Sequence, residues 1–187
     1  MNPQLFDLQL GPEGFAYREN LVTPREEADL LEILEGLPFE PFQFQGFEGR
    51  RRVVSYGLRY DFNGGGLIPT EPIPEWLLPA RNRAAAFAGL APDALVQVLI
   101  NEYREGAPIG WHRDRPVFDK VVGVSLKSPT TLRFRRRDGA RWQRSAVVLA
   151  PRSVYLLDGP ARRDWEHSIP EAKGHRFSIT FRSLRET

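Results

Sequence analysis

The chain of 187 residues has no cysteine and only three histidines. Without thiols it can form neither a disulfide framework nor a thiolate metal site, so any bound metal must be held by histidine, aspartate or glutamate. Long apolar runs are also missing, and none approaches the roughly 20 residues that a membrane-spanning helix needs. The N-terminal stretch MNPQLFDLQL lacks the basic and apolar regions of a signal peptide. We therefore expect a cytoplasmic protein with no membrane partner, and we expect it to be a monomer.

Lysine is scarce as well, because three lysines among 26 basic residues leave 26 − 3 = 23 arginines. A genome rich in G and C accounts for part of this bias, so clusters are more informative than the total. The formal net charge is only +2, and the chain is therefore not basic throughout. Arginines do cluster at 50–52 (RRR) and at 133–137 (RFRRR), and arginine binds carboxylates and phosphates in a two-pronged fashion.

Two segments in the first half of the chain have helical patterns. In residues 22–37, Thr23 and Glu26 form a capping box and Gly36 marks the end of the helix. Ala28, Leu31 and Leu34 would form its apolar stripe. Residues 74–90 predict a second helix. Between the two, residues 51–62 read as a strand or hairpin, and residues 63–74 read as a loop rich in glycine and proline.

From residue 95 onward, short β-type runs follow one another without a long helix, at 95–103, 119–126, 130–137, 145–150, 153–159 and 177–182. Turn-like pairs join them, such as Asp138-Gly139 and Asp158-Gly159. This pattern predicts an α+β, mainly β fold whose core is an antiparallel barrel or jelly roll. We expect a single domain over residues 1–187. Residues 1–94 would hold the outer helices, and residues 95–187 the jelly-roll core.

The stretch WHRD at 111–114 holds a candidate pair of metal ligands. His112 and Asp114 are two residues apart, so both side chains point to one side of an extended strand. Such a triplet on its own is usually a chance pairing. A distant second imidazole, His167, would complete a set of two histidines and one carboxylate, which leaves three positions open on Fe(II). A jelly roll can bring such distant strands to one site.

The last strand-like run, RFSITFR, carries Arg176 and Arg182 at an even separation. Ser178 and Thr180 therefore lie on the same face as both arginines, and the residues of the opposite face are apolar. Two guanidinium groups on one face suit a dicarboxylate ligand, although pairing with local acids or water is the alternative. The run NEY places Asn101 and Tyr103 on one face of another strand, and both can donate hydrogen bonds to carboxylates.

The segments NEYREGAPIGWHRD, ARRDWEHSI and RFSITFR resemble the AlkB family of Fe(II)/2-oxoglutarate-dependent dioxygenases. That family has the pattern N-x-Y-x-x-G-x-x-I-x-x-H-x-D, followed by a distal histidine and by two arginines with five residues between them. Every fixed position is present here: Asn101, Tyr103, Gly106, Ile109, His112, Asp114, His167, Arg176 and Arg182. The resemblance covers about residues 96–183 closely, and residues 51–62 look like the lid hairpin that covers the family's substrate. It implies that residues 1–94 include a nucleotide-recognition lid and that residues 95–187 form the catalytic core.

The resemblance implies a double-stranded β-helix in which His112, Asp114 and His167 bind Fe(II) as the catalytic centre. It also implies 2-oxoglutarate and O2 as co-substrates, with succinate and CO2 as products and hydroxylation of a substrate C–H bond. When that bond belongs to an N-methyl group, the product releases an aldehyde. The family precedent therefore suggests demethylation or dealkylation of bases in DNA or RNA.

By the same resemblance, five residues bind 2-oxoglutarate. Arg176 and Tyr103 would hold the distal carboxylate, and Arg182 and Asn101 the end near the iron. Ser178 occupies the place between the two arginines where the repair enzyme that names the family has asparagine.

Residues for the nucleic-acid substrate come partly from the charge pattern and partly from the resemblance. Arginines 133, 135 and 137 alternate onto one strand face and, beside aromatic residues, suit phosphate contacts and base stacking. Arg115 stands where the repair enzyme has an acidic substrate contact, and Arg162 matches a family position near the substrate. The expected substrate residues are Arg51, Tyr56, Tyr60, Arg115, Arg162 and Trp165. The alternative is that these aromatic residues fill the core and the arginines coat a solvated edge.

Three other functions remain open. The segments HRDRPVFD and GPARRDWEH look more similar to the tRNA-modifying members of the family, which hydroxylate a modified base. A dioxygenase acting on protein or on a small molecule would have the same metal centre. A jelly roll that binds nucleic acid without chemistry would have no need of a complete ligand set.

Overall fold

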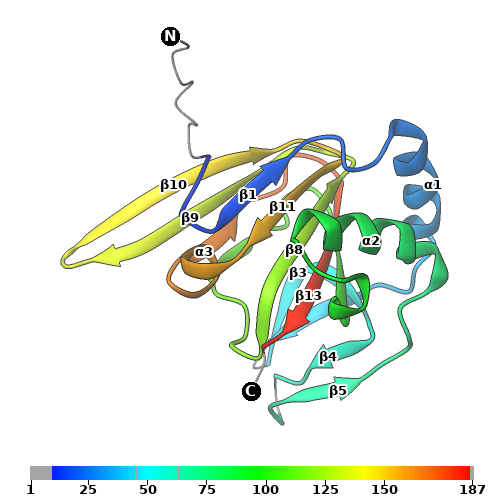
Figure 1. Cartoon of the computed structure of the whole chain (residues 1–187), viewed down its shortest axis with the longest axis horizontal. Helices are drawn as coiled ribbons and strands as arrows, with labels where there is room; N and C mark the ends of the chain where they lie inside the picture. The colour runs from blue at the N-terminus through cyan, green and yellow to red at the C-terminus, as the bar shows by residue number, and fades with distance from the viewer. Residues whose placement is uncertain (1–9, 45, 63, 186–187) are drawn as a thin grey trace.

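A computed structural model describes residues 10–44, 46–62 and 64–185 of the chain. Two antiparallel β-sheets face each other, and helices cover the outer face of the larger sheet (Figure 1). This arrangement confirms the expected mainly β fold with a double-stranded β-helix and outer helices.

Within the described residues the larger sheet has seven strands. Their spatial order is β1 (Phe15–Arg18), β11 (Ser153–Leu157), β8 (Phe118–Leu126), β13 (Arg176–Leu184), β6 (Gln97–Tyr103), β3 (Phe47–Tyr56) and β2 (Glu40–Phe44). The smaller sheet has four strands in the same part of the chain, in the order β10 (Arg141–Leu149), β9 (Thr130–Asp138), β12 (Glu166–Ile169) and β7 (Ile109–His112). Strands β9 and β10 form a long hairpin that extends beyond the body of the protein (Figure 1).

The remaining elements are short strands and helices. They are α1 (Pro24–Glu35), β4 (Leu58–Tyr60), β5 (Leu67–Pro69), the 3-10 helices Glu75–Leu77 and Pro92–Ala94, α2 (Leu78–Phe87) and α3 (Gly159–Arg163). Asp158-Gly159, expected to be a turn, begins α3, because the Asp158 carboxylate accepts a hydrogen bond from the Gly159 backbone N–H. Among the described residues, no helix is both long enough and apolar enough to cross a membrane.

The core has two parts, one on each face of the larger sheet. Helices α1 and α2 pack on one face, and the smaller sheet packs on the other. Strand β13 shows how the sequence builds both layers. Its alternate residues Phe177, Ile179 and Phe181 are fully buried beneath the helices, so Arg176 and Ser178 face the space between the sheets. The expected division of this strand into a polar and an apolar face is confirmed.

Helix α1 begins as predicted but buries a different stripe. The Thr23 hydroxyl accepts from the Glu26 N–H, and the Glu26 carboxylate accepts from the Thr23 N–H. Leu34 is buried as expected, whereas Ala28 is exposed and Leu30 is buried in its place. Glu27 shares the buried side, because its carboxylate binds the Arg152 guanidinium and the backbone N–H of Lys127. Because of these contacts, the buried side of α1 includes a charged residue and does not coincide with the apolar stripe.

The segment expected to form one lid hairpin over residues 51–62 is divided between two sheets. Its first half belongs to β3, which pairs with β6 in the larger sheet. Gly57 separates the halves at a φ of 76°, and a Cβ there would lie 2.2 Å from the Val96 carbonyl oxygen. The second half forms β4, which pairs with β5 in the segment that was expected to be a loop. Strands β2 and β3 form a second hairpin, in addition to the β4–β5 pair.

Candidate active site

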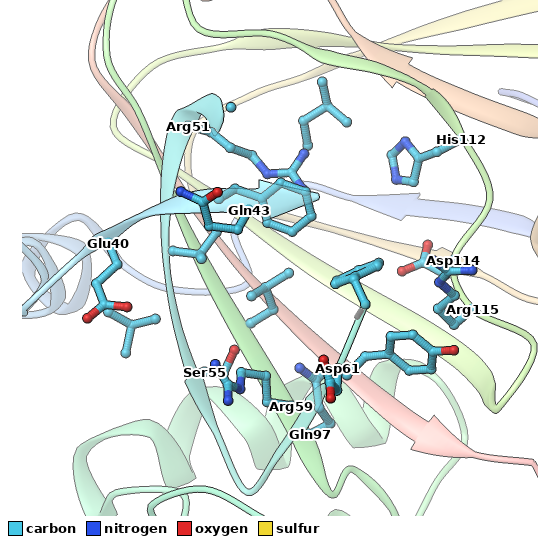
Figure 2. A pocket seen from close by; sticks show the side chains of 18 of the residues that line it. Glu40, Gln43, Arg51, Ser55, Arg59, Asp61, Gln97, His112, Asp114 and Arg115 are labelled. Carbon is cyan, nitrogen blue, oxygen red and sulfur yellow. The ribbon is translucent and has the colours of Figure 1, made fainter. Parts of the chain in front are cut away.

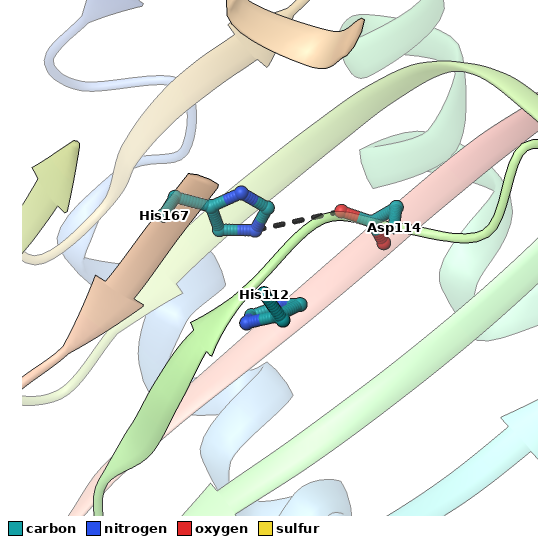
Figure 3. A group of neighbouring side chains, drawn as sticks. All are labelled: His112, Asp114 and His167. Atoms are coloured by element: carbon teal, nitrogen blue, oxygen red, sulfur yellow. Dashed lines mark ion pairs between the residues drawn. The ribbon is translucent and has the colours of Figure 1, made fainter. Parts of the chain in front are cut away.

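Three side chains converge between the two sheets. His112 ends β7 and pairs directly with His167 of β12, and Asp114 follows His112 by two residues (Figure 3). The two imidazole rings are 4.3 Å apart between centroids. His167 Nε2 lies 3.4 Å from Asp114 Oδ2. One ligand atom from each residue lies within 4.8 Å of the others, a spacing that fits a single metal ion coordinated by all three.

Burial keeps both imidazoles in the neutral form that can ligate a metal. Desolvation, together with the neighbouring His112, lowers the pKa of His167 to about 3. Burial also lowers the pKa of His112. The Gly110 carbonyl oxygen lies 2.9 Å from His112 Nδ1, so that nitrogen acts as the hydrogen-bond donor and Nε2 keeps its lone pair for a ligand bond.

Arginines hold the carboxylate of Asp114 and the loop that follows it. Burial alone would raise the pKa of Asp114, but the Arg182 guanidinium brings it below its ordinary value. Arg182 donates to Oδ1 from Nε at 2.8 Å, and Nη2 lies 2.7 Å from the same oxygen. Arg162 donates to the backbone carbonyls of Asp114, Arg115 and Phe118 at 3.2, 2.6 and 2.7 Å.

A small cavity beside the triad is lined by four of the five residues expected to bind 2-oxoglutarate. Asn101, Tyr103, Ser178 and Arg182 line it. Arg176 lies next to it with 1% of its surface exposed, and its guanidinium stacks on the Tyr103 ring at 4.8 Å. Arg176 donates to the Ser125 hydroxyl from Nε and Nη2. Among the described residues, its Nη1 has no hydrogen-bond partner.

The unpaired Nη1 of the Arg176 guanidinium fits a carboxylate ligand. A buried guanidinium without a counter-charge is costly, and a carboxylate satisfies it in a two-pronged fashion. Asn101 donates from Nδ2 to the Ser178 hydroxyl at 3.3 Å. Its Oδ1, unpartnered within the described chain, is an acceptor and needs a donor rather than a carboxylate. The guanidinium donors therefore fit 2-oxoglutarate. In this structure Arg182 bonds to Asp114 and Gln97 rather than to Asn101.

Comparison with known proteins agrees with this geometry. A family model described as the 2OG-Fe(II) oxygenase superfamily matches residues 14–182. The DNA oxidative demethylase ALKBH2 of Homo sapiens is 30% identical over 200 residues, which cover 92% of this chain and 74% of that protein. This chain belongs to the AlkB family of 2OG-Fe(II) oxygenases.

Another relative of this AlkB-family oxygenase supports the family, and a solved structure supports the fold. The alkylated DNA repair protein ALKBH8 homolog of Arabidopsis thaliana is 28% identical over 97% of this chain and 61% of its own length. The solved structure of OsALKBH1 superposes with a TM-score of 0.71 over 94% of this chain and all of that chain, at 16% identity, which shows a shared fold. The chain is thus an oxidoreductase of the dioxygenase class, and its family uses Fe(II), 2-oxoglutarate and O2.

An open pocket of about 950 Å³ leads from the surface to the His112 and Asp114 side of this oxygenase's triad (Figure 2). Three of the expected substrate residues line it, namely Arg51, Tyr60 and Arg115. The Arg51 guanidinium lies 3.8 Å from the centre of the Phe42 ring, and burial lowers its pKa. Arg115 lies over Tyr60 at 4.8 Å, so the pocket wall combines cations with aromatic faces.

The other three expected substrate residues do not line this pocket. Tyr56 packs edge-on against Trp76 and on the core beneath the helices. Trp165 is buried in the core between the sheets, with Arg136 4.9 Å from its ring centre. The Arg162 guanidinium is engaged by the three backbone carbonyls of the loop after Asp114. Arg162 therefore holds the loop after Asp114, whereas Tyr56 and Trp165 belong to the core.

Sequence reasoning missed several residues at the site. Trp111 and Phe42 line the open pocket, as does Gln97, whose Oε1 accepts from Arg182 at 2.8 Å. The even spacing from Gln97 to Asn101 on β6 was a usable signal, because it places both on one strand face. Phe42 gave no such signal, because β2 is a short strand whose position depends on its pairing with β3.

Proposed function

We propose that this oxygenase oxidatively demethylates or dealkylates bases in DNA or RNA. The observation that carries the proposal is the open pocket, which meets His112 and Asp114 directly and has cationic and aromatic walls. Its volume of about 950 Å³ lies within the range of small-molecule sites. An enzyme that modifies a base must take that base out of the stack, and a pocket of this kind accepts one flipped nucleotide.

The pocket wall offers two cation–aromatic pairs to such a nucleotide. Arg51 on Phe42 lies toward the β2–β3 hairpin, and Arg115 on Tyr60 lies toward β4. Aromatic faces stack on bases of any sequence, and arginine contributes both charge and a flat surface. The Arg51 Nε has no hydrogen-bond partner among the described residues, so this buried guanidinium has a donor for an oxygen or ring nitrogen of the base.

A surface outside the pocket supports binding of the flanking strand. We call it the arginine–tryptophan ladder, and it consists of Arg133, Trp111, Arg135, Trp142 and Arg137. The successive guanidinium-to-ring distances are 5.2, 4.5, 4.4 and 4.3 Å. The expected alternation of the three arginines is therefore present, and the aromatic residues beside them are Trp111 and Trp142.

The ladder begins at the pocket and extends along the β9–β10 hairpin. Trp111 lines the pocket, and Arg137 lies exposed near the hairpin tip. Arg135 is neutralised by the Glu166 carboxylate at 2.6 Å, whereas Arg133 donates to the uncharged Ser168 hydroxyl. A strand leaving the pocket would therefore meet rings for stacking, with charges for phosphates at Arg133 and Arg137.

The names of two relatives point to the same class of substrate. The human protein is named a DNA oxidative demethylase, and the Arabidopsis protein an alkylated DNA repair protein homolog. At 28–30% identity these names support a nucleic acid without specifying the base.

In the proposed reaction His112, Asp114 and His167 would hold Fe(II), and Arg176, Tyr103, Asn101, Ser178 and Arg182 would hold 2-oxoglutarate. Together with O2 these groups supply the oxidation of a substrate C–H bond and release succinate and CO2. The protein orients the reactants. Arg182 binds Oδ1 of Asp114 and leaves Oδ2 facing His167, and the pocket would position the base. An N-methyl group oxidised to N-hydroxymethyl then releases formaldehyde and leaves an N–H bond.

The test is a panel of alkylated and modified oligonucleotides, single- and double-stranded, in DNA and RNA, incubated with Fe(II), ascorbate and 2-oxoglutarate and read by mass spectrometry. Loss of the alkyl mass supports the proposal. Gain of one oxygen without loss of carbon would instead show base hydroxylation, and no change on any nucleic acid would contradict a nucleic-acid substrate. Asp114→Ala should abolish turnover, and unchanged succinate formation by this variant would refute the metal assignment.

The ladder has its own test in the salt dependence of binding. Each phosphate contact contributes about 0.7 to the slope of log K against log salt for a single strand and about 0.9 for B-DNA. Arg137→Gln should reduce the slope by about one contact, and Trp142→Ala should weaken binding with little change in slope. Arg25→Gln on α1 is the matched control and should change neither quantity. A ladder variant that binds like the control would contradict this surface.

A further inference from the structure

Tyr155 on β11 is a buried tyrosine that neither the metal triad nor the expected 2-oxoglutarate residues include. It pairs with Gly123 of β8, and Gly123 pairs on its other side with Thr180 of β13. The three positions therefore lie in one row across the larger sheet. Its side chain points to the space between the sheets, because it lines the small cavity together with Tyr103 and Ser178.

Gly123 makes room for this side chain. A Cβ at position 123 would lie 2.2 Å from Tyr155 Cζ and 2.5 Å from the hydroxyl oxygen. The backbone of Gly123 has no left-handed φ that would itself require glycine. Its lack of a side chain thus lets the Tyr155 ring lie across β8, with the hydroxyl directed toward β13.

On β13 the row of Tyr155 reaches Thr180, which lies on the polar face that begins with Arg176. Tyr103 stacks on Arg176 from the β6 side, and Tyr155 approaches from the β11 side. Burial, aided by Tyr103 and opposed by Arg176, raises the pKa of Tyr155 to about 12. The hydroxyl thus keeps its proton and is a hydrogen-bond donor at physiological pH.

We propose that Tyr155 donates a hydrogen bond to the distal carboxylate of 2-oxoglutarate, alongside the Arg176 guanidinium and opposite Tyr103. The buried Arg176 Nη1, unpartnered within the described residues, is the charge that this carboxylate neutralises. The metal triad would take the other end of the same molecule. This inference rests on the family's use of 2-oxoglutarate and is independent of which primary substrate the enzyme oxidises.

Packing is the competing explanation for Tyr155. Its ring belongs to the core between the sheets and stacks on Phe15 at 6.4 Å between centroids. A phenylalanine would fill that role equally well and would spare the enclosure of a polar hydroxyl. The two explanations therefore differ in what Tyr155→Phe does to ligand binding.

The experiment measures binding by calorimetry, without oxygen, with Mn(II) in place of Fe(II). The ligands are 2-oxoglutarate and 2-oxovalerate, which has the same carbon skeleton with a methyl group in place of the distal carboxylate; the weaker ligand is measured by competition. Tyr155→Phe should raise the Kd of 2-oxoglutarate about tenfold and change that of 2-oxovalerate by less than about twofold. The Tyr17→Phe variant removes a hydroxyl that accepts from the Ala150 N–H in the turn between β10 and β11, and it should affect neither ligand.

Equal losses for the two ligands, or no loss for either, would overturn the proposal and leave Tyr155 with a packing role. Failure of the unaltered protein to bind 2-oxoglutarate would overturn it as well. Products on the oligonucleotide panel do not enter this measurement, so the proposed function can fail while the Tyr155 assignment holds, and the reverse.

Gly123 offers a second route to the same test. Gly123→Ala should displace the ring and weaken 2-oxoglutarate binding at least as much as Tyr155→Phe does. Adding Tyr155→Leu to Gly123→Ala should relieve the steric clash and recover thermal stability, while 2-oxoglutarate binding stays weak. Recovery of binding together with stability would contradict a role for the hydroxyl.

Discussion

The neutral imidazole of His167 should make the metal-free protein sensitive to mild acid. Its folded-state pKa is about 3, against an ordinary value of 6.5. Between these pH values His167 is protonated in the unfolded chain but not in the folded chain. The stability of the folded state is therefore fully present above about pH 6.5 and is lost as the pH falls. At about pH 5 the difference from 6.5 is about 1.5 pH units, and His167 alone should therefore lower the free energy of unfolding by about 2 kcal/mol. The lowered pKa of His112 acts in the same direction.

The chain is well suited to this measurement. It has only three histidines and no cysteine, so few groups titrate between about pH 5 and 7. The assay is urea unfolding followed by tryptophan fluorescence at both pH values, with a chelator present. His167→Asn should be less stable at neutral pH but should lose clearly less than the unaltered protein on acidification. Equal losses in the two proteins, or no loss in either, would refute the claim that burial keeps His167 neutral.

Three further outcomes follow from the same contacts. Arg162→Met removes three hydrogen bonds to the loop that begins at Asp114 and should lower the free energy of unfolding by about 1–3 kcal/mol, measured by urea denaturation. Arg176→Lys keeps the charge but loses the two-pronged hydrogen bonding of the guanidinium. It should raise the KM for 2-oxoglutarate about tenfold with a smaller effect on kcat. Adding Mn(II) should raise the melting temperature of the unaltered protein and leave that of Asp114→Ala unchanged.

The parts of the fold that follow from local patterns could be predicted. The alternation on β13 places Phe177, Ile179 and Phe181 under the helices, and the capping box at Thr23 begins α1. The parts that depend on distant partners could not. The buried face of α1 includes Glu27 because its carboxylate has partners far along the chain, and these are invisible to a helical stripe of apolar residues.

The metal triad could be predicted because its residue types are scarce and chemically specific. In a chain with three histidines, His112 and His167 leave little choice, and the even spacing to Asp114 fixes its side. Substrate residues were harder, because arginine and aromatic side chains serve equally well in cores and in pockets. Trp165 is buried beneath Arg136, whereas Trp111 lines the pocket, and only the tertiary arrangement separates the two cases.

Arg182 has a contact in the site that residue spacing alone does not predict. An even separation from Arg176 places it correctly on the polar face of β13, but does not show that it reaches Asp114 on the opposite side of the cavity. By binding Oδ1 it leaves Oδ2 facing His167, so the two oxygens of one carboxylate are assigned to different partners. The ion pair also offsets the burial that would otherwise favour protonated Asp114. The same arginine thus prepares an ionised, oriented ligand before any metal arrives, and loss of its fork would impair metal binding even if 2-oxoglutarate found another partner.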